Sequence, residues 1–414
     1  MIKAAAFLAL AATLFVPSHT FGQDDDNIVT TDHFVPHTST VPANAGDVVD
    51  LFLRERVRRG HETEKPGKPV LMVHGRSVPI LAGMDLRHDG YSWALRLAKA
   101  GFDVFMLDFQ GSGLSTRPKM DDPCNVNPAQ RSILTPNPLS VPCPQPTAKY
   151  QAQLINIGSD WDELNTVVDF IRAYRGVDKV ALVSWSEGAF RIGPYAIQHP
   201  DKVESALFFA PIFNPNGRAS KPGTRFVAPV SLPVTSPAAQ FGFPMTLTTK
   251  DVLMTLWDND QSQQCEGQRE EGIQDVVWSS IMDNDARGRG WGPVFPDGSV
   301  EGVMRVRNPF LWGWNSATAV LDGTLGGAVP VLIIYGEHDT QVAAGPFSVP
   351  ALYNAIPGAS KLMFKVACTG HFMVWESQRR VLHHISKHWL MHGAVEGFTS
   401  GTFFVDTEGT ILPQ

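Results

Sequence analysis

The chain has 414 residues and a mass of 45.3 kDa, which suits one large α/β domain with an insertion, or two to three domains. Hydrophobic residues make up 43% and charged residues 18%, which permits a large packed core and excludes a disordered or coiled-coil chain. Lys and Arg number 34 against 41 Asp and Glu, a formal charge of −7, so no basic surplus exists for a nucleic-acid partner.

Residues 1–22 are typical of a secretory signal peptide. Lys3 supplies a basic start, an apolar run extends from Ala4 to Val16, and small residues precede the expected cleavage before Gln23. The apolar run is shorter than the roughly 20 residues that cross a bilayer, and no later stretch reaches that length. We therefore expect a secreted or periplasmic protein without a membrane span. The alternative interpretation is a buried N-terminal helix.

Export makes disulfides possible for the four cysteines, which allow three pairings. Cys124 and Cys143 bracket a segment rich in Pro and Asn, so a bridge that closes this loop is the favoured pairing. It leaves Cys265 to pair with Cys368 over a long range. The sequence contains no C-x-x-C pair, which argues against a metal site at these cysteines.

Hydrophobic patterning predicts strands that alternate with helices. The expected strands span 48–57, 69–73, 102–107, 179–183, 206–210, 329–335 and 360–366, and the expected helices span 91–100, 187–198 and 381–392, with a further helix that starts at 159. Short apolar runs such as 69–73 fit a parallel sheet buried on both faces, whereas 48–57 alternates and fits an antiparallel edge. Residues 23–45 are expected to form an arm or first strand, and 402–412 a small hairpin.

Residues 214–328 interrupt this alternation, because they contain no signal of a buried parallel strand. The segment holds prolines, polar turns and the tryptophans Trp257, Trp278, Trp291, Trp312 and Trp314. Linkers are not rich in tryptophan, so we predict a cap inserted into an α/β core made of 23–213 and 329–414. One or two of these tryptophans are expected to face the active site.

A candidate nucleophile stands where the strand 179–183 meets the next helix. Ser-Trp-Ser-Glu-Gly at 184–188 has small residues two before and two after Ser186, as a strained strand-to-helix turn requires. Such a turn exposes Ser186 Oγ and puts the Glu187 backbone N–H at a helix N-terminus, where it stabilises an oxyanion. Trp185 is expected to contact the substrate, with packing beneath the turn as the alternative.

Together with three further motifs, this turn resembles the α/β-hydrolase superfamily, in its serine-nucleophile, esterase-like branch with a large inserted cap. The motifs are His-Gly-Arg-Ser at 74–77, Gly-Glu-His-Asp at 336–339 and Gly-His at 370–371. The resemblance implies an α/β-hydrolase fold: a mostly parallel central sheet, helices on both faces and an inserted cap domain. It also implies the catalytic order nucleophile, acid, histidine.

The resemblance assigns these roles to Ser186, Asp339 and His371. The imidazole of His371 would take the serine proton, and a buried carboxylate would fix its tautomer. Glu337 competes with Asp339 for that place, whereas Asp108 is expected to cap structure.

In the resembling enzymes the second oxyanion donor is the backbone N–H after the His-Gly pair, here Arg76. The Arg76 side chain is expected in solvent or a structural ion pair, with an anion contact as the alternative.

Four histidines, His383, His384, His388 and His392, lie in the expected last helix. No carboxylate or cysteine is suitably interleaved, so we predict no metal site there, and no cofactor.

The sequence therefore predicts a secreted serine hydrolase that cleaves a small-molecule carboxylic ester through an acyl-enzyme, with a bulky apolar or aromatic substrate. A serine at the turn argues against dehalogenase or epoxide-hydrolase chemistry. Amidase or peptidase, lactonase and acyltransferase activities remain alternatives for the same triad, and a non-catalytic binding protein is a remote one. A bridge between Cys265 and Cys368 would clamp the cap to the loop of His371. No oligomeric state is predicted.

Overall fold

The computed structural model describes residues 27–62, 67–134, 143, 153–229 and 244–414, so the expected signal peptide lies outside the described residues. The strands are β1 (Ile28–Thr38), β2 (Val48–Arg58), β3 (Pro69–Val73), β4 (Asp103–Leu107), β5 (Val180–Trp185), β6 (Val203–Phe209), β7 (Met245–Thr248), β8 (Met304–Arg307), β9 (Val331–Gly336), β10 (Lys361–Val366), β11 (Gly401–Val405) and β12 (Ile411–Pro413). The α-helices are α1 (Ile80–Met84), α2 (Trp93–Lys99), α3 (Ile157–Arg175), α4 (Gly188–Gln198), α5 (Lys250–Asp258), α6 (Ile273–Asp283), α7 (Ala286–Arg289), α8 (Ser316–Ala319), α9 (Val349–Ala355) and α10 (Arg379–His392).

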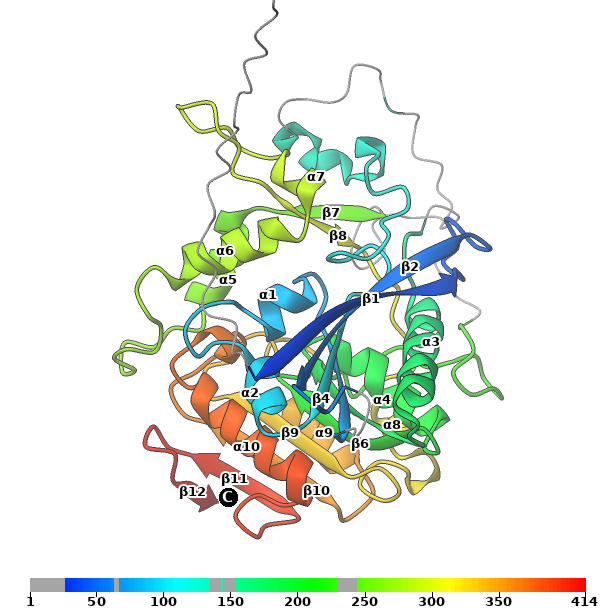
Figure 1. Ribbon diagram of the computed structural model, residues 1–414, viewed down its shortest axis with the longest axis vertical. Helices are drawn as coiled ribbons and strands as arrows, with labels where there is room; N and C mark the ends of the chain where they lie inside the picture. The colour runs from blue at the N-terminus through cyan, green and yellow to red at the C-terminus, as the bar shows by residue number, and fades with distance from the viewer. Residues whose placement is uncertain (1–26, 63–66, 135–142, 144–152, 230–243) are drawn as a thin grey trace, which may run out of the picture.

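A ten-stranded sheet forms the centre of the molecule, in the order β1-β2-β4-β3-β5-β6-β9-β10-β11-β12 (Figure 1). The pairs from β4 to β11 are parallel. Helices α2 and α10 contact each other over one face, while α3 and α4 pack together over the other. Both faces are therefore covered, which is why every residue of β3, β4 and β5 is buried. The predicted mostly parallel sheet with helices on both faces is confirmed.

Antiparallel strands end the sheet on both sides. β1 is the outer strand at one edge and pairs with β2 along its whole length, from Ile28 opposite Arg58 to Thr38 opposite Val48. At the other edge β11 and β12 form the small hairpin that the sequence predicts.

Two short helices, α1 and α9, were not predicted. They contain five and seven residues, too few turns for a helical repeat of apolar residues to stand out in a sequence.

Between β6 and β9 the chain leaves the central sheet. We call residues 214–328 the insertion; its strands β7 and β8 pair antiparallel in a separate two-stranded sheet. Figure 1 shows this pair with α5, α6 and α7 above the central sheet. All five tryptophans of the insertion are buried. In the described part of the chain, none of the helices combines the length and the apolar character needed to cross a membrane.

Candidate active site

The turn between β5 and α4 carries Ser186 in a left-handed backbone conformation, with φ of +57°. This conformation is costly for a residue other than glycine and is held by its surroundings. A Cβ added to Gly188 would lie 2.9 Å from the carbonyl oxygen of His74 and 3.1 Å from Ser184 Cβ. Only small residues at 184 and 188 therefore allow the turn to pack against the end of β3.

Three side chains meet at this turn in a continuous chain of hydrogen bonds. Ser186 Oγ lies 2.9 Å from His371 Nε2. His371 Nδ1 lies 2.9 Å from Asp339 Oδ2 and 3.1 Å from Oδ1. Asp339 is buried, and its Oδ1 accepts the backbone N–H groups of Gln341 and Val342 at 3.0 and 3.1 Å. The structure thus brings together the three residues to which the sequence assigns the catalytic roles.

Glu337, the competing acid, contacts other groups. Its Oε2 accepts the backbone N–H of Cys368 at 3.4 Å and lies 3.8 Å from His338 Nε2. Asp108 caps structure, as expected: its carboxylate accepts the backbone N–H groups of Ile80 and Leu114 at 2.8 and 3.0 Å.

A second carboxylate, from the insertion, holds residues 368–372, which we call the histidine loop. Asp260 is fully buried and its Oδ2 accepts the backbone N–H of His371 at 2.7 Å. Its Oδ1 accepts the backbone N–H and the hydroxyl of Thr340, at 3.0 and 2.6 Å, beside the candidate acid. A Cβ on Gly370 would lie 2.3 Å from Asp260 Cβ, so this approach requires glycine. Burial raises the pKa of Asp260 despite these hydrogen bonds, and the Asp339 charge adds to the rise.

Glu376 ties the same loop to the insertion. Its buried carboxylate accepts the backbone N–H of Gly370 at 2.9 Å and the hydroxyl of Thr369 at 2.5 Å. It also accepts the indole N–H of Trp257 at 2.8 Å. The disulfide between Cys265 and Cys368 adds a covalent link between the insertion and the strand-to-loop junction before His371. The second disulfide joins Cys124 to Cys143.

The sequence did not reveal Asp260 or Glu376 as site residues, because neither stands in a motif. Their only signal is three-dimensional: buried carboxylates whose acceptors face the histidine loop.

Trp185 lies beneath the turn. It is 2% exposed, its indole N–H donates to the carbonyl oxygen of His371 at 3.0 Å, and its ring packs edge-on against Trp375. The ring also lines the cavity at Ser186. Packing beneath the turn, the alternative interpretation of Trp185, therefore accounts for its main contacts.

The loop after β3 passes close to the candidate nucleophile. A Cβ on Gly75 would lie 3.1 Å from Ser186 Cβ, so the Gly75–Arg76 peptide runs beside the serine. Glu187, whose backbone N–H is the other predicted oxyanion donor, is the residue at the N-terminal end of α4. Its side chain is buried near Arg191 and Arg76, and burial raises its pKa.

The Arg76 side chain does not extend into solvent. Its Nη2 donates to Asn308 Oδ1 of the insertion at 2.9 Å, and burial lowers the pKa of the guanidinium. It lines the cavity because the insertion covers this loop.

The cavity at Ser186 has a volume of about 360 Å³ and lies between the core and the insertion. Most of its apolar lining comes from the insertion: Leu247, Val252, Leu253, Leu256, Met304 and Val306. Val252 and Leu256 are 49% and 40% exposed. Contrary to expectation, the tryptophans of the insertion are not among the lining residues that the structure describes. They pack inside instead: Trp257 and Trp312 donate their indole N–H groups to buried acceptors, and Trp278 donates to the half-buried carbonyl oxygen of Glu301.

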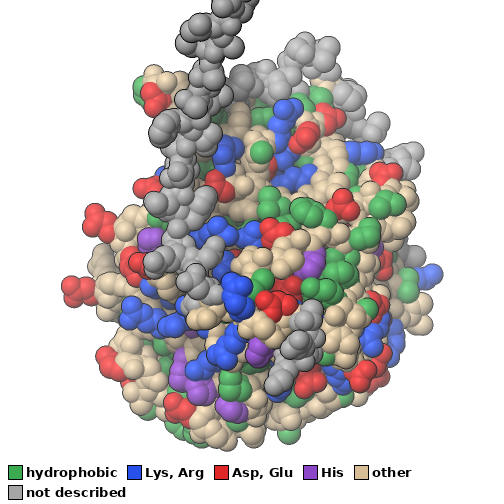
Figure 2. Space-filling model, viewed as in Figure 1, with side chains coloured by type: hydrophobic (Ala, Val, Ile, Leu, Met, Phe, Trp, Pro, Cys, Tyr) green, Lys and Arg blue, Asp and Glu red, His purple; other side chains and the backbone are tan. Residues whose placement is uncertain are grey.

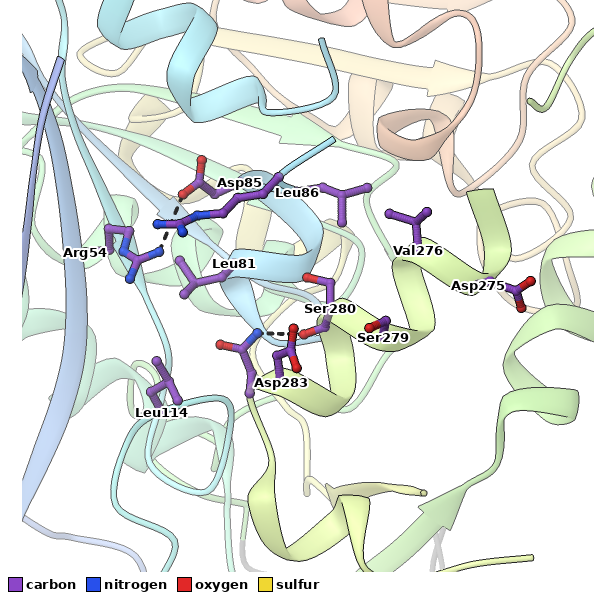
Figure 3. A pocket seen from close by; sticks show the side chains of 12 residues that line it. Arg54, Leu81, Asp85, Leu86, Leu114, Asp275, Val276, Ser279, Ser280 and Asp283 are labelled. Atoms are coloured by element: carbon purple, nitrogen blue, oxygen red, sulfur yellow. Dashed lines mark hydrogen bonds and ion pairs between the residues drawn. The ribbon is translucent and has the colours of Figure 1, made fainter. Parts of the chain in front are cut away.

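A second hollow, of about 580 Å³, lies between the segment around α1 and helix α6 (Figure 3). Asp85 lies in its wall, and Asp85 Oδ2 is 3.8 Å from Arg54 Nη1 and 2.9 Å from Arg56 Nε, so the negative charge of Asp85 is already paired. None of the three residues of the hydrogen-bonded chain lines it. The larger hollow is therefore not the candidate active site.

Side chains of types that bind metals lie together at one place in the described part of the chain. Cys265, His338 and Cys368 have their ligand atoms within 4.8 Å of one another, but the two sulfurs are joined in a disulfide and offer no thiolate. Figure 2 shows histidines over the outer face of α10, where the rings of His384 and His388 lie 4.3 Å apart. This pair has no third ligand among the described residues.

Among the comparisons with known proteins, the family profile identifies the fold. No curated protein matches the chain. Among solved structures, a putative lipase from Sulfolobus solfataricus is 14% identical, with 92% of this chain and 98% of that chain covered and a TM-score of 0.47. The carboxylesterase CesB from Bacillus subtilis is 12% identical, with 89% and 93% covered and a TM-score of 0.43. A family profile described as the alpha/beta hydrolase fold matches residues 68–378. The chain therefore belongs to the α/β-hydrolase family.

Proposed function

We propose that this α/β hydrolase is an exported serine esterase that cleaves carboxylic esters through an acyl-enzyme. The observation that carries the proposal is the hydrogen-bonded chain from Ser186 Oγ through His371 to the buried carboxylate of Asp339. An alcohol is a weak nucleophile until a base removes its proton, and this series of hydrogen bonds supplies a base with an oriented tautomer.

The proposed reaction uses these three side chains. Ser186 Oγ attacks the ester carbonyl carbon while His371 Nε2 takes the hydroxyl proton, and Asp339 stabilises the resulting imidazolium. The backbone N–H groups of Arg76 and Glu187 stabilise the oxyanion. The carbonyl carbon–oxygen bond to the alcohol breaks as His371 returns the proton to the leaving oxygen. Water then attacks the acyl-enzyme with the same base and releases the acid.

Bulky apolar groups are the proposed substrate class, and residues 214–328 are the proposed cap. Six apolar side chains of the insertion line the cavity, and two of them, on α5, are exposed toward solvent. Exposed apolar side chains in a cavity wall gain stability when a substrate covers them.

Labelling with a fluorophosphonate tests the nucleophile. We expect the wild-type chain to react once and lose activity, Ser186→Ala to resist labelling, and the control Ser377→Ala to react like the wild type. Labelling of Ser186→Ala would overturn the assignment.

A panel of aryl and alkyl esters tests the substrate class. We expect kcat/KM to rise with the apolar bulk of the acyl group. A preference for acetate esters over all bulkier acids would contradict the proposed class, and turnover of amides or lactones instead of esters would contradict the esterase assignment.

Export is tested by N-terminal sequencing of the protein from the secreted or periplasmic fraction. We expect the mature chain to begin at Gln23; a chain that begins at Met1 would contradict a cleaved signal peptide.

A further inference from the structure

A buried arginine on α4 contacts the loop that follows β3. Arg191 is 1% exposed, and its Nη1 donates to the carbonyl oxygens of His74 and Gly75, both at 2.9 Å. Its Nε donates to Asp160 Oδ2 at 2.6 Å, which neutralises the buried guanidinium. The chemistry of the triad does not use this side chain, so its contacts need another explanation.

The Gly75 carbonyl oxygen accepts a second donor. His74 Nδ1 lies 2.6 Å from it, while His74 Nε2 accepts the backbone N–H of Phe109 at 3.4 Å. Burial, and then the charge of Arg191, lower the pKa of His74 well below its usual value, so the ring is neutral. With Nε2 as acceptor, the proton is on Nδ1, which donates to Gly75. Two donors therefore hold this carbonyl on the side of α4.

The direction of that carbonyl determines the direction of the next N–H. In a planar trans peptide the C=O and the N–H point to opposite sides, so fixing Gly75 C=O toward Arg191 turns the Arg76 N–H away from it. A Cβ on Gly75 would lie 3.1 Å from Ser186 Cβ and 3.7 Å from Ser186 Oγ, so the peptide that bears the Arg76 N–H runs beside the serine. We propose that Arg191 is a positioning residue that aims the Arg76 backbone N–H into the oxyanion hole; this inference rests on the proposed serine esterase function.

Arg191 also fixes the two oxyanion donors relative to each other. Glu187 lies immediately before α4, the helix that carries Arg191, so the Glu187 N–H moves with that helix. The guanidinium connects this helix to the loop that carries the Arg76 N–H. Asp160, near the start of α3, holds the guanidinium through Nε, and Arg191 Cζ lies over the Phe109 ring, 4.7 Å from its centroid. The guanidinium offers its donors in a fixed planar fork that suits the carboxylate and the two carbonyls, whereas the three donors of an ammonium group rotate about a single nitrogen.

The test compares Arg191→Met and Arg191→Lys with a control, Arg175→Met. Arg175 is likewise buried on a helix and paired with carboxylates, Glu55 and Asp103, but it lies outside the cavity. We expect Arg191→Met to lower kcat about 10²-fold, in the range for loss of one oxyanion donor, with KM changed less than about threefold. Arg191→Lys should fold as the more conservative variant and recover part of kcat. The control should lose stability but keep kcat.

A transition-state analogue separates positioning from general damage. A trifluoromethyl ketone binds as an oxyanion on Ser186, whereas the matching methyl ketone binds as a neutral ligand. We expect the trifluoromethyl ketone to bind both Arg191 variants more weakly by the factor lost in kcat/KM, with methyl ketone affinity unchanged. Equal weakening of both ketones, or an unchanged kcat in a folded Arg191→Met, would overturn the positioning role alone. Failure of the wild type to react with the fluorophosphonate would overturn the esterase function as well.

Discussion

The two sides of the hydrogen-bonded chain are supported by different regions of the molecule. On the nucleophile side, the backbone N–H of Ser186 donates to the carbonyl oxygen of Phe209 at 2.9 Å, and its own carbonyl accepts from Ile212 at 3.1 Å. These contacts come from the last residue of β6 and from the segment that follows it, within the core. On the base side, the backbone N–H of His371 donates to Asp260, which belongs to the insertion.

The insertion therefore supports the loop that carries His371 as well as forming a wall of the cavity. Asp260, Trp257 and Cys265 reach the histidine loop by a hydrogen bond, an indole contact through Glu376 and a disulfide. A change in the insertion should therefore disturb the base while the nucleophile turn stays intact.

Replacement of the candidate acid should lower activity most. Asp339→Asn removes the charge that fixes the His371 tautomer, so we expect kcat to fall by about 10³- to 10⁴-fold. Glu337→Gln is the matched control two residues away and should keep kcat within about twofold. Steady-state kinetics on one ester decide it. A larger loss in Glu337→Gln would exchange the two roles.

Removal of the long-range disulfide should lower stability and activity together. In Cys265→Ser/Cys368→Ser the free energy of unfolding is expected to fall by about 2–4 kcal/mol. The bridge spans 103 residues against 19 for Cys124–Cys143, so the matching double variant there should lose about 1–2 kcal/mol less.

Activity separates the two bridges further. Only the variant without Cys265–Cys368 should lose kcat under conditions where the fold, followed by circular dichroism, is intact. Equal kcat losses in the two double variants would show that the link to the histidine loop has no special role.

Asp260→Asn tests the insertion's contact with the base directly. An amide keeps the shape but has one acceptor oxygen and an N–H₂ group, so it can satisfy either His371 or Thr340 and meets the other donor with a donor. We expect kcat to fall about 10- to 100-fold. Asp258→Asn, an exposed neighbour paired with Arg269, is the control and should change nothing. Fluorophosphonate labelling should slow less than kcat falls if the nucleophile turn keeps its shape.

The sequence predicted the core well and the support of the site poorly, for a physical reason. The buried parallel strands and the small residues around Ser186 could be predicted because each depends on a local requirement. A buried strand needs a short run of apolar residues, a tight turn needs space for its backbone, and adjacent residues in the sequence show both. The role of Asp260 depends on a histidine 111 positions later, and that of Arg191 on a carbonyl 116 positions earlier. No local pattern distinguishes such residues from ordinary surface charges.

Replacement of a core histidine, His383, should alter activity least. His383 is buried on α10 beside Trp93, and burial, aided by Arg96 and Arg379, lowers its pKa to about 3. Between pH 3 and 6.5 the unfolded chain binds this proton and the folded chain does not. The free energy of unfolding therefore rises with pH through this window. The stability that the neutral His383 contributes is lost as pH falls through the same window.

His383→Phe should reduce the loss of stability between pH 7 and pH 5 by about 1–2 kcal/mol, as measured by denaturant unfolding at both values. Phenylalanine keeps a ring against Trp93, so the variant should fold. The ring of His383 stacks on Trp93, whereas the residue of α10 that hydrogen-bonds Glu376 is Arg379, so kcat at pH 7 should stay unchanged. A changed kcat would show that the base side depends on this face of the core as well as on the insertion.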